Sequence, residues 1–526
     1  MPKSKSPMSA KRLPLIIFSA LTILIVILYW LSQKGDAWST HFNFSEEFKV
    51  GFPYSTSLAE FDPARVEVAG QYALLENLYI PLLLKDNEGR LVPGAAAKFY
   101  WVGDEIEFVI NDKLVDSGGE KITVDDVYFS LMRLLVLGSS THGDLRNLIC
   151  SDKQPQTVDD KCEGLRIVDG KLRVKPARKT LTIFDNFSAI DFSVIPRRSV
   201  DPNDLKTIDL SITSGVYYIK ERRRDGSLVL AANTKHIFYS DRIPQTAIFV
   251  PTRETKKSGL ELFESGEIDY LSPLDQTDIS ERIDRYKHSD KVHIFQTLTV
   301  RLELIAFTEK GLQLSSERRW SVGNRLANEL AKAYAGRSGF KLAYQYFPEG
   351  GKGSISPADL EPVISLRNKP ALNNEDGSGI VIGFFPRNYD KMKPLVAKAL
   401  PGIKVVQMTK LPAYDKNISS SDYPHLYVVS MDTGFLEELP NVINSLKSGF
   451  LGTTNDEREK WLSNYLINTD EAERLTALRE LHLKSLLSPV IIPIVRTPYV
   501  SLVRKPWRPN FSFLFPNSPV WKISRD

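Results

Sequence analysis

Apolar and polar side chains alternate in several short segments of the chain, as they do in strands that bury one face. Between Glu105 and Asn111, Ile106, Phe108 and Ile110 fall on one side of such a strand. Residues 213–220 and 227–231 flank an Asp225-Gly226 turn and predict a hairpin. Further strands are predicted at 48–52, 302–307, 426–429, 490–495 and 499–503.

Helical spacing follows some of these strands. Val127, Leu131, Leu134 and Leu135 fall on one helical face, and Thr123 with Asp126 three residues later is typical of a capping box. Further helices are predicted at 260–266, 316–334 and 470–486. Strands at 379–385 and 403–408 bracket another helix, so the alternation predicts an α/β fold.

Two polar stretches predict irregular structure. Residues 86–89, Asp-Asn-Glu-Gly, read as a tight turn after the apolar run that ends at Leu84. Residues 350–376 are rich in Gly, Ser, Pro and Asn, which predicts a mobile surface stretch.

Residues 13–31 form an uncharged apolar run near the start of the chain. Its length matches the ~20 residues that span a bilayer, and Lys3, Lys5, Lys11 and Arg12 precede it. The positive-inside rule then places everything after the run outside the cytoplasm. Because residues 29–37 offer only a poor cleavage site, we expect an uncleaved single-pass anchor, with a cleaved signal peptide as the alternative.

The two cysteines, Cys150 and Cys162, lie in one polar stretch beyond the apolar run. An oxidising compartment would join them, and a loop of this size contributes about 3 kcal/mol in the chain-entropy model. Free thiols or half of a metal site are the alternatives, but the spacing and the lack of a nearby histidine speak against zinc. We predict a disulfide.

The 526 residues include 68 Lys and Arg against 64 Asp and Glu. Residues 1–36 hold five basic groups and one acidic group, so the excess of four belongs to that segment and the exported body is neutral. Such a body gives no support to nucleic-acid binding, which needs a clustered basic face.

Catalytic motifs are missing from the sequence: no G-x-S-x-G, H-E-x-x-H or phosphate-cradling glycine loop occurs. Among the seven histidines, His288 and His293 are the nearest pair, and their spacing matches no common metal-ligand motif. We interpret them as solvated loop residues. The sequence therefore favours binding over catalysis, with no cofactor and no metal.

Three blocks of sequence resemble one family when taken in order. The first is LENLYIPLLLKDNEGRLVPG at 75–94 with ITVDDVYFSLMRLL at 122–135. The second joins Thr213–Tyr217, Asn233 and SGEID at 265–269, and the third joins 302–307 to SERRW at 316–320. Their order resembles the extracytoplasmic solute-binding proteins of ABC importers, family 5, the peptide, oligopeptide and nickel type. The loop at Thr234, Lys235 and His236 departs from it, because the family usually has Pro and Tyr-Trp there.

The resemblance implies a two-lobed periplasmic-binding-protein fold of class II type with an additional subdomain. The implied division is 1–36 for the cytoplasmic flank and transmembrane anchor, 37–47 for a tether, 48–74 with 206–295 and 491–526 for lobe I, 75–205 for the extra subdomain, and 296–490 for lobe II.

The implied function is to bind a peptide or similar extended solute between two closing lobes and to deliver it to a membrane permease. The protein would act as a monomer on the outer side of the cytoplasmic membrane. Two rivals stay open: a membrane-anchored sensor or scaffold that keeps the fold without transport, and an exported enzyme, which the missing motifs disfavour.

The resemblance also indicates ligand contacts. Glu67 and Ala69 match the segment that pairs with peptide main chain in oligopeptide binders, although the same residues could form an ordinary strand or loop. Phe435 and Glu438 stand where the family has the Trp and the ammonium-binding Asp of a Gly-Trp-x-x-Asp stretch. A solvated acidic turn at 437–438 is the alternative interpretation.

Overall fold

The computed structural model describes residues 47–525 except for short gaps. The gaps are 54–60, 67–68, 139–148, 151–153, 178–182, 253–254, 276–277, 298–300, 370–376, 411, 413–418, 433–437, 453, 469 and 513–518. The predicted anchor at 13–31 lies outside the described residues. Within them, no helix is both long enough and apolar enough to cross a bilayer.

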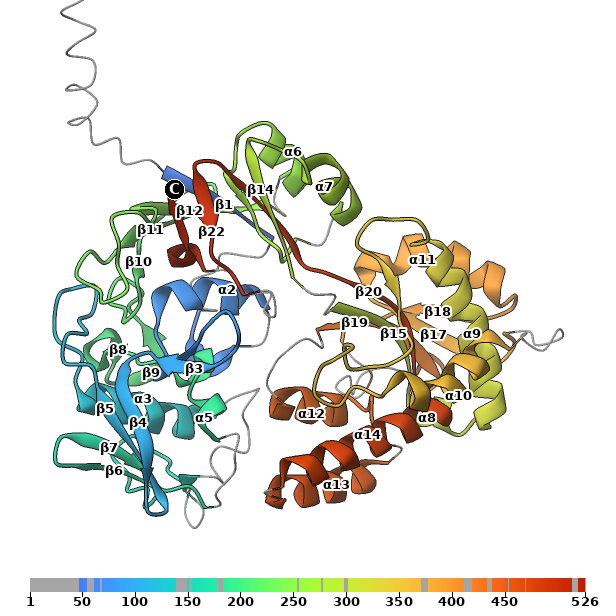
Figure 1. Ribbon diagram of the computed structural model, residues 1–526, viewed down its shortest axis with the longest axis horizontal. Helices are drawn as coiled ribbons and strands as arrows, with labels where there is room; N and C mark the ends of the chain where they lie inside the picture. Colours follow the sequence, from blue (N-terminus) through green and yellow to red (C-terminus); the bar gives the residue numbers. More distant parts are fainter. Residues whose placement is uncertain are drawn as a thin grey trace, which may run out of the picture. The chain divides into compact units, whose positions relative to one another are not determined.

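A seven-stranded sheet collects strands from both ends of the described chain (Figure 1). Its order is β10 (Tyr217–Arg222), β11 (Leu228–Ala232), β12 (Thr246–Pro251), β1 (Glu47–Phe52), β13 (Tyr270–Leu271), β21 (Val500–Arg504) and β14 (Val292–Gln296). β1 runs parallel to β12 and β13, so the carboxyl ends of these three strands share one edge. Helices α2 (Ala69–Leu78), α6 (Gly259–Glu264) and α7 (Ile279–Tyr286) accompany this sheet.

A six-stranded sheet forms the second large layer. Its order is β16 (Lys341–Leu342), β20 (Ile491–Thr497), β15 (Arg301–Phe307), β19 (Leu426–Asp432), β17 (Val381–Phe384) and β18 (Lys404–Gln407). Its helices are α8 (Glu309–Leu312), α9 (Ser316–Lys332), α10 (Pro357–Asn368), α11 (Pro386–Ala399), α12 (Glu438–Lys447), α13 (Asn455–Ile467) and α14 (Glu471–Leu487). The predicted strand–helix–strand unit at 379–408 is confirmed as β17, α11 and β18.

A four-stranded antiparallel sheet forms a third layer. Its order is β4 (Ala96–Val102), β5 (Glu105–Ile110), β7 (Lys171–Val174) and β6 (Leu165–Val168). Helix α3 (Val124–Leu137) packs with it and has the predicted capping box between Thr123 and Asp126. Smaller elements are β2 (Leu83–Lys85) with β3 (Leu91–Pro93), α5 (Ile183–Asn186), β8 (Val200–Asp201) with β9 (Asp204–Ile208), and β22 (Trp507–Pro509) with β23 (Ile523–Arg525).

Each of these three sheets has its own hydrophobic cluster. One cluster is built from residues between 302 and 495, one mainly from residues between 80 and 194, and one from β1, β10 to β12 and the segment near the C-terminus. Strand pairing differs at one point from the division expected from the sequence. β20 pairs with β15 along its length, so residues 491–497 belong to the six-stranded sheet and not with β21.

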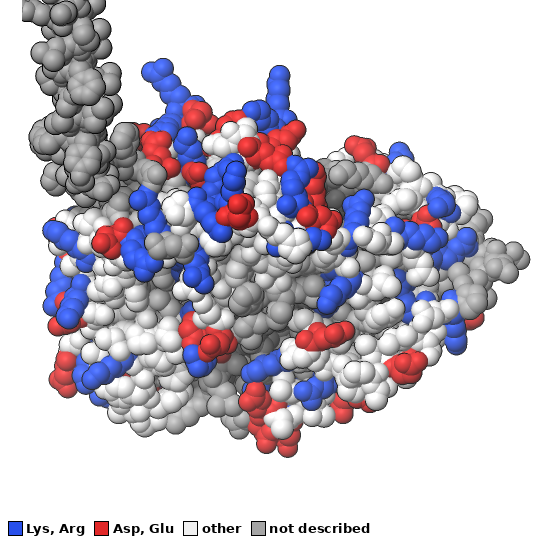
Figure 2. Space-filling view, turned by 45° about the horizontal axis from the view of Figure 1, so that its top comes forward, with Lys and Arg blue, Asp and Glu red and all other residues white. Residues whose placement is uncertain are grey.

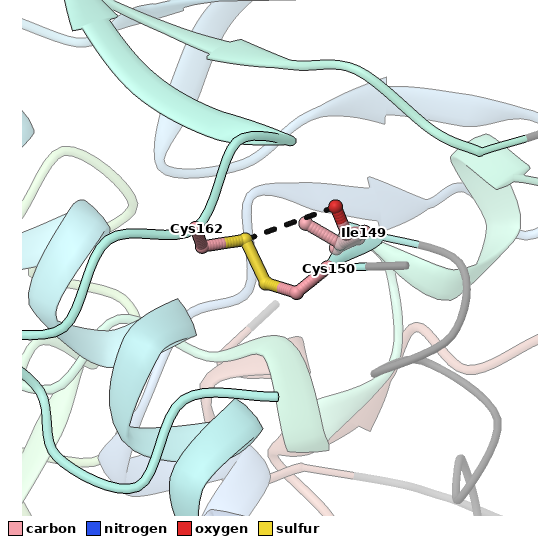
Figure 3. Close-up of a disulfide and its surroundings, with 3 residues drawn as sticks. All are labelled: Ile149, Cys150 and Cys162. Atoms are coloured by element: carbon pink, nitrogen blue, oxygen red, sulfur yellow. Dashed lines mark hydrogen bonds between the residues drawn. A yellow bond between two sulfur atoms is a disulfide. The ribbon is translucent and has the colours of Figure 1, made fainter. Parts of the chain in front are cut away.

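The predicted disulfide is confirmed: Cys150 and Cys162 are bonded, with Cα atoms 5.3 Å apart (Figure 3). Both cysteines are buried in the cluster of the four-stranded sheet. Gly164 lies so close to the Ile149 carbonyl that a Cβ at this position would stand 1.8 Å from its oxygen. The loop therefore closes against the backbone of its own first residues.

The prediction for the stretch rich in Gly, Ser, Pro and Asn is wrong. Residues 350–376 were expected to form a mobile surface stretch, but 357–368 form helix α10, which buries Leu360, Val363 and Arg367. Ser356 caps this helix through the Asp359 amide, and Pro357 occupies its first turn. Pro is favourable at that position because its missing N–H has no helical partner in any case.

Charged side chains are mixed over the described part of the face shown in Figure 2, where basic and acidic residues lie beside one another. This agrees with the equal numbers of basic and acidic residues that follow residue 36.

Candidate functional site

Two short connections join the large sheets. One runs from β14 to β15 and the other from β20 through Pro498 and Tyr499 to β21. β14 pairs with β21 in one sheet and β15 pairs with β20 in the other, so the two connections are neighbours. The Thr297 amide donates to the Tyr499 carbonyl at 3.0 Å, and the Tyr499 amide donates to Thr297 Oγ1 at 2.9 Å. A paired crossing of this kind is suited to act as a hinge.

A small hollow of about 10 Å³, room for about one water molecule, opens at the carboxyl ends of the parallel strands β1, β12 and β13. Ligands of open α/β sheets bind at this kind of edge. The lining is almost wholly apolar and consists of Val50, Phe52, Ala73, Phe249, Tyr270, Ser272, Pro273, Leu274 and Val520.

A polar group lies next to the hollow, at the joint. Arg301 opens β15, Asp432 ends β19, and the two are register partners on neighbouring strands. Arg301 Nη1 donates to the Tyr499 hydroxyl at 3.0 Å and lies 3.6 Å from Asp432 Oδ1. The Tyr499 ring packs against Leu274 and Ala73, which line the hollow. Tyr499 thus connects an apolar wall to a pair of opposite charges.

The titration of this polar group follows from its surroundings. Burial lowers the pKa of Arg301, but Tyr499 and Asp432 outweigh that effect, so its pKa is raised and the guanidinium is charged. Burial, reinforced by the Asp432 carboxylate, raises the pKa of Tyr499 well above its usual value. Tyr499 is therefore a neutral hydroxyl at any physiological pH.

The four residues expected to contact the ligand lie at or beyond the limits of the described chain. Glu67 and Phe435 lie outside the described residues. Ala69 and Glu438 begin α2 and α12, but their side chains are not described. Their roles remain predictions. Among the described residues next to them, α2 contributes Ala73 to the hollow and β19 ends at Asp432.

The sequence did not predict three residues of this group: Arg301, Asp432 and Tyr499. Arg301 and Asp432 stand at the ends of otherwise apolar strands, and this position was the signal available. Nothing local in the sequence shows that the two strands are neighbours, because 118 residues, 308–425, separate β15 from β19 along the chain and the sheet pairing brings them together.

A buried ion pair fixes the chain just before Glu67. Both oxygens of Asp62 accept from Arg133, at 2.9 and 2.7 Å, and both side chains are almost fully buried. Asp62 also accepts from the Ala64 amide and from Arg65 Nε. Residues 61–66 are therefore held rigidly against α3.

His236 belongs to the fold and not to the site. It is buried, its Nε2 donates to the Ser214 carbonyl, and its Nδ1 accepts from the Phe238 amide. Burial lowers the pKa of His236 to about 4, so the ring is neutral. The departure from the family pattern in this loop is accommodated in the core.

His288 and His293, the nearest histidine pair in the sequence, lie in different elements. His288 lies in the turn after α7, whereas His293 is half-buried in β14 opposite Val503, so it is not the solvated loop residue that was expected. In the described part of the chain, no three His, Cys, Asp or Glu side chains gather in a way that could hold a metal ion.

Known proteins match the chain by structure and not by sequence. No protein-family model and no curated protein matches it. The structure of the murein tripeptide binding protein MppA of Escherichia coli is similar, with a TM-score of 0.67 and 16% identity over 91% of this chain and 98% of MppA.

Two further solved structures are similar to the same extent. Haemophilus influenzae OppA in complex with the peptide RPPGFSPFR has a TM-score of 0.67 and 15% identity, over 92% of this chain and 99% of OppA. A dipeptide binding protein of Pseudoalteromonas sp. SM9913 in complex with Met-Leu has a TM-score of 0.68 and 12% identity, over 91% of this chain and 100% of that protein. The chain therefore has the two-lobed α/β fold of the family 5 solute-binding proteins, and the expected resemblance is confirmed for the fold.

Proposed function

From this shared fold, we propose that the chain is the solute-binding component of an ABC importer. It binds a peptide or similar extended solute between two lobes that close about the paired crossing, and it delivers the solute to a permease in the membrane. One observation carries this proposal: a paired crossing joins the two large sheets and the Arg301–Asp432 pair lies beside it, where hinge closure would enclose a solute.

We further propose where the protein resides. The apolar run at 13–31, with its basic flank, holds the protein in the cytoplasmic membrane, with the main body as a monomer on the outer side. The confirmed disulfide supports this, because disulfides persist in oxidising compartments.

The residues indicated by the resemblance complete the proposed solute path. Glu67 and Ala69 offer main-chain groups, and the buried Asp62–Arg133 pair holds the preceding segment in place. From the resemblance, Phe435 and Glu438 are proposed as further ligand contacts. A Glu438→Ala variant with unchanged peptide affinity would remove Glu438 from the site.

The alternative is a membrane-anchored sensor or scaffold with the same fold. The departures from the family pattern at His236 and Phe435 permit it. His236 is a buried part of the core, so that departure says little about solute binding, and we favour the importer.

Peptide binding can be tested by thermal unfolding of the full-length protein in detergent. Pools of peptides of defined length should raise the midpoint temperature in a saturable way, since a ligand at a hundred times its Kd stabilises by about 2.7 kcal/mol. A matched pair of variants locates the effect. Ala73→Leu narrows the hollow and should reduce the shift, whereas Ala335→Leu, at an exposed position after α9, should leave it unchanged. Equal shifts in both variants, or no shift with any pool, would count against the proposal.

A further inference from the structure

Another contact joins the two large sheets, apart from the paired crossing. Helix α7 lies against the turn that follows α9. The Ser280 hydroxyl donates to the Ser338 carbonyl at 2.9 Å, and the Ser338 hydroxyl donates to Asp284 Oδ1 at 2.6 Å. A Cβ on Gly339 would stand 2.8 Å from Ile283 Cδ1, so the backbone of the turn packs closely on the helix. We call this the α7–turn contact.

Each side of the α7–turn contact is fixed to a different sheet. Arg282 of α7 is buried and donates from Nη1 to the Val500 carbonyl of β21 at 3.0 Å, in the seven-stranded sheet. Arg282 Nη2 also lies 3.2 Å from Asp275 Oδ1. The turn runs into β16, which pairs with β20 in the six-stranded sheet. Movement of one sheet relative to the other therefore acts on this contact.

The contact lies across the crossing from the charged pair at the joint. Pro498 and Tyr499 are the consecutive residues between β20 and β21. A Cβ on Gly339 would stand 3.4 Å from Pro498 Cδ, so Pro498 faces the turn. The Tyr499 ring instead packs toward α2, and its hydroxyl accepts from Arg301. Figure 1 shows the same arrangement, with α7 above the crossing and α12 below it.

Rotation about the crossing has opposite effects on its two sides. Closure of the lobes brings the sheets together on the side of Arg301 and α12. The same rotation carries α7 away from the turn on the opposite side. Closure therefore separates Ser338 from Ser280 and Asp284, and the α7–turn contact opposes it.

The contact is built so that it can open. Asp284 is exposed, and Ser280 and Ser338 are half-buried, so water can replace both hydrogen bonds when the helix and the turn separate. Gly339 presents only backbone to Ile283, so no side chain at this position has to leave a pocket. The contact therefore favours the open arrangement by a small free energy that a bound solute can overcome.

We propose that the α7–turn contact is a latch for the open arrangement: it is made while the lobes are apart, and it is released when they close on a solute. A solute that is held by the closed lobes is then bound more weakly, in proportion to the fraction of molecules that have closed. This inference rests on the proposed function. It adds that residues which do not touch the solute set the affinity for it.

Variants can remove the latch without touching the joint. Ser338→Ala removes the donor to Asp284 and keeps the backbone of the turn, and Asp284→Ala removes the acceptor of the same bond. The double variant should add nothing to either single variant, since all three lack the same interaction. Ser419→Ala is the matched control. The Ser419 hydroxyl donates to Asp422 Oδ2 at 2.9 Å at an exposed site between β18 and β19, which belong to one sheet.

Spin labels report the arrangement of the lobes in the full-length protein in detergent, without any solute. Asp125→Cys at the start of α3 and Lys460→Cys in α13 place the labels at exposed positions. Both helices lie below the crossing in Figure 1, on the side away from α7. The native Cys150 and Cys162 are bonded to each other and take no label. Pulsed electron paramagnetic resonance then measures the distance between the labels.

Release of the latch should shift this distance and the affinity together. Ser338→Ala should raise the ratio of short to long distances about 3- to 10-fold, which corresponds to about 0.7–1.4 kcal/mol and is the range of one hydrogen bond. The concentration of a random-sequence tripeptide pool that gives half-maximal thermal stabilisation should fall by a similar factor. Ser419→Ala should change neither quantity.

The distances test the latch independently of peptide binding. Unchanged distances in Ser338→Ala and Asp284→Ala, or a shift toward longer ones, would overturn it. Shorter distances without tighter binding of a pool that does bind would overturn it as well. If the distances shorten and no form of the protein binds the pool, the latch stands and the proposed function is wrong. If the pool binds and the distances do not change, the proposed function stands without the latch.

Discussion

Buried ion pairs connect distant segments of this fold. Asp62 and Arg133 are the clearest case, with two hydrogen bonds between them and additional bonds to Arg65 and Ala64. Such a pair contributes little more stability than apolar side chains would at the same place. Removing one partner, however, leaves the other charge buried and unpaired. The pair therefore holds residues 61–66 against α3 only when both residues are present.

Substitution of Arg133 by Met should lower the free energy of unfolding by about 3–5 kcal/mol, because Asp62 is left buried without its main partner. Arg65→Met is the matched control: Arg65 bonds the same carboxylate from a side chain that is 40% exposed, so about 1 kcal/mol or less is expected. Denaturant unfolding measures both. Losses of equal size in the two variants would show that burial of the pair is unimportant.

Two buried histidines should make stability depend on pH. Burial lowers the pKa of His236 to about 4 and that of His482 to about 3, both below the usual 6.5. The unfolded chain therefore binds more protons between these values, and the stability present above pH 6.5 is lost as the pH falls. Each ring contributes a slope of up to about 1.4 kcal/mol per pH unit.

His482→Gln should flatten the dependence of unfolding free energy on pH between 6 and 5, while its exposed counterpart His288→Gln should leave it unchanged. His482 accepts from the Tyr346 amide and donates to the Gly353 carbonyl, so Gln can keep part of this bonding. Denaturation series at several pH values give the slopes. An unchanged slope in His482→Gln would contradict the assignment of a neutral ring.

The sequence revealed residues whose role is local. Thr123 with Asp126, and Cys150 with Cys162, act within a few residues of each other, so their spacing alone predicts the interaction. Arg301, Asp432 and Tyr499 act across the fold, and their meeting depends on strand pairing between distant segments. The candidate site was therefore only partly visible in the sequence.

At the scale of elements, α7 is held against the turn that follows α9. The Ser338 hydroxyl donates to Asp284 at 2.6 Å, and the Ser280 hydroxyl donates to the Ser338 carbonyl at 2.9 Å. Gly339 has φ +85°, and a Cβ there would stand 2.8 Å from Ile283 Cδ1 and 3.4 Å from Pro498 Cδ. Gly339 therefore packs against Pro498, which with Tyr499 joins β20 to β21.

Gly339→Val should destabilise the protein by about 1–3 kcal/mol more than Gly336→Val, because added bulk in a packed site forces shifts. Gly336 is the matched control. Its φ of +74° imposes the same backbone strain, but a Cβ there would meet nothing within 4 Å. Chemical denaturation of both variants gives the difference. Equal losses would mean that the contact between α7 and the 338–339 turn adds nothing to stability.

Helix α10 shows how an element can be missed. Its surroundings are rich in Gly, Ser and Pro, which predicted an irregular stretch, yet Ser356 and Pro357 are the start signals of a helix. Its amphipathic pattern is weak, since Leu360, Val363 and Arg367 are its buried side chains. The composition of the stretch concealed the helix.

At the scale of the molecule, the order of strands required more than local pattern. β1 and β21 lie in one sheet although they come from opposite ends of the described chain. β20 lies in the other sheet, although it is separated from β21 by two residues. Periodicity identified most strands of the two large sheets but missed β12, β14 and β16. The family resemblance implied only a division into lobes, and that division grouped 491–497 with β21, whereas β20 pairs with β15.

The central claim is that the protein holds a small solute at the joint between its two large sheets. Native mass spectrometry of the full-length protein, isolated from the cells that produce it, tests this most directly. We expect a bound species of peptide or amino-acid mass that is released on denaturation and is reduced in the Ala73→Leu variant. A protein that carries no bound solute, and takes up none when mixed with peptides and amino acids, would contradict the account.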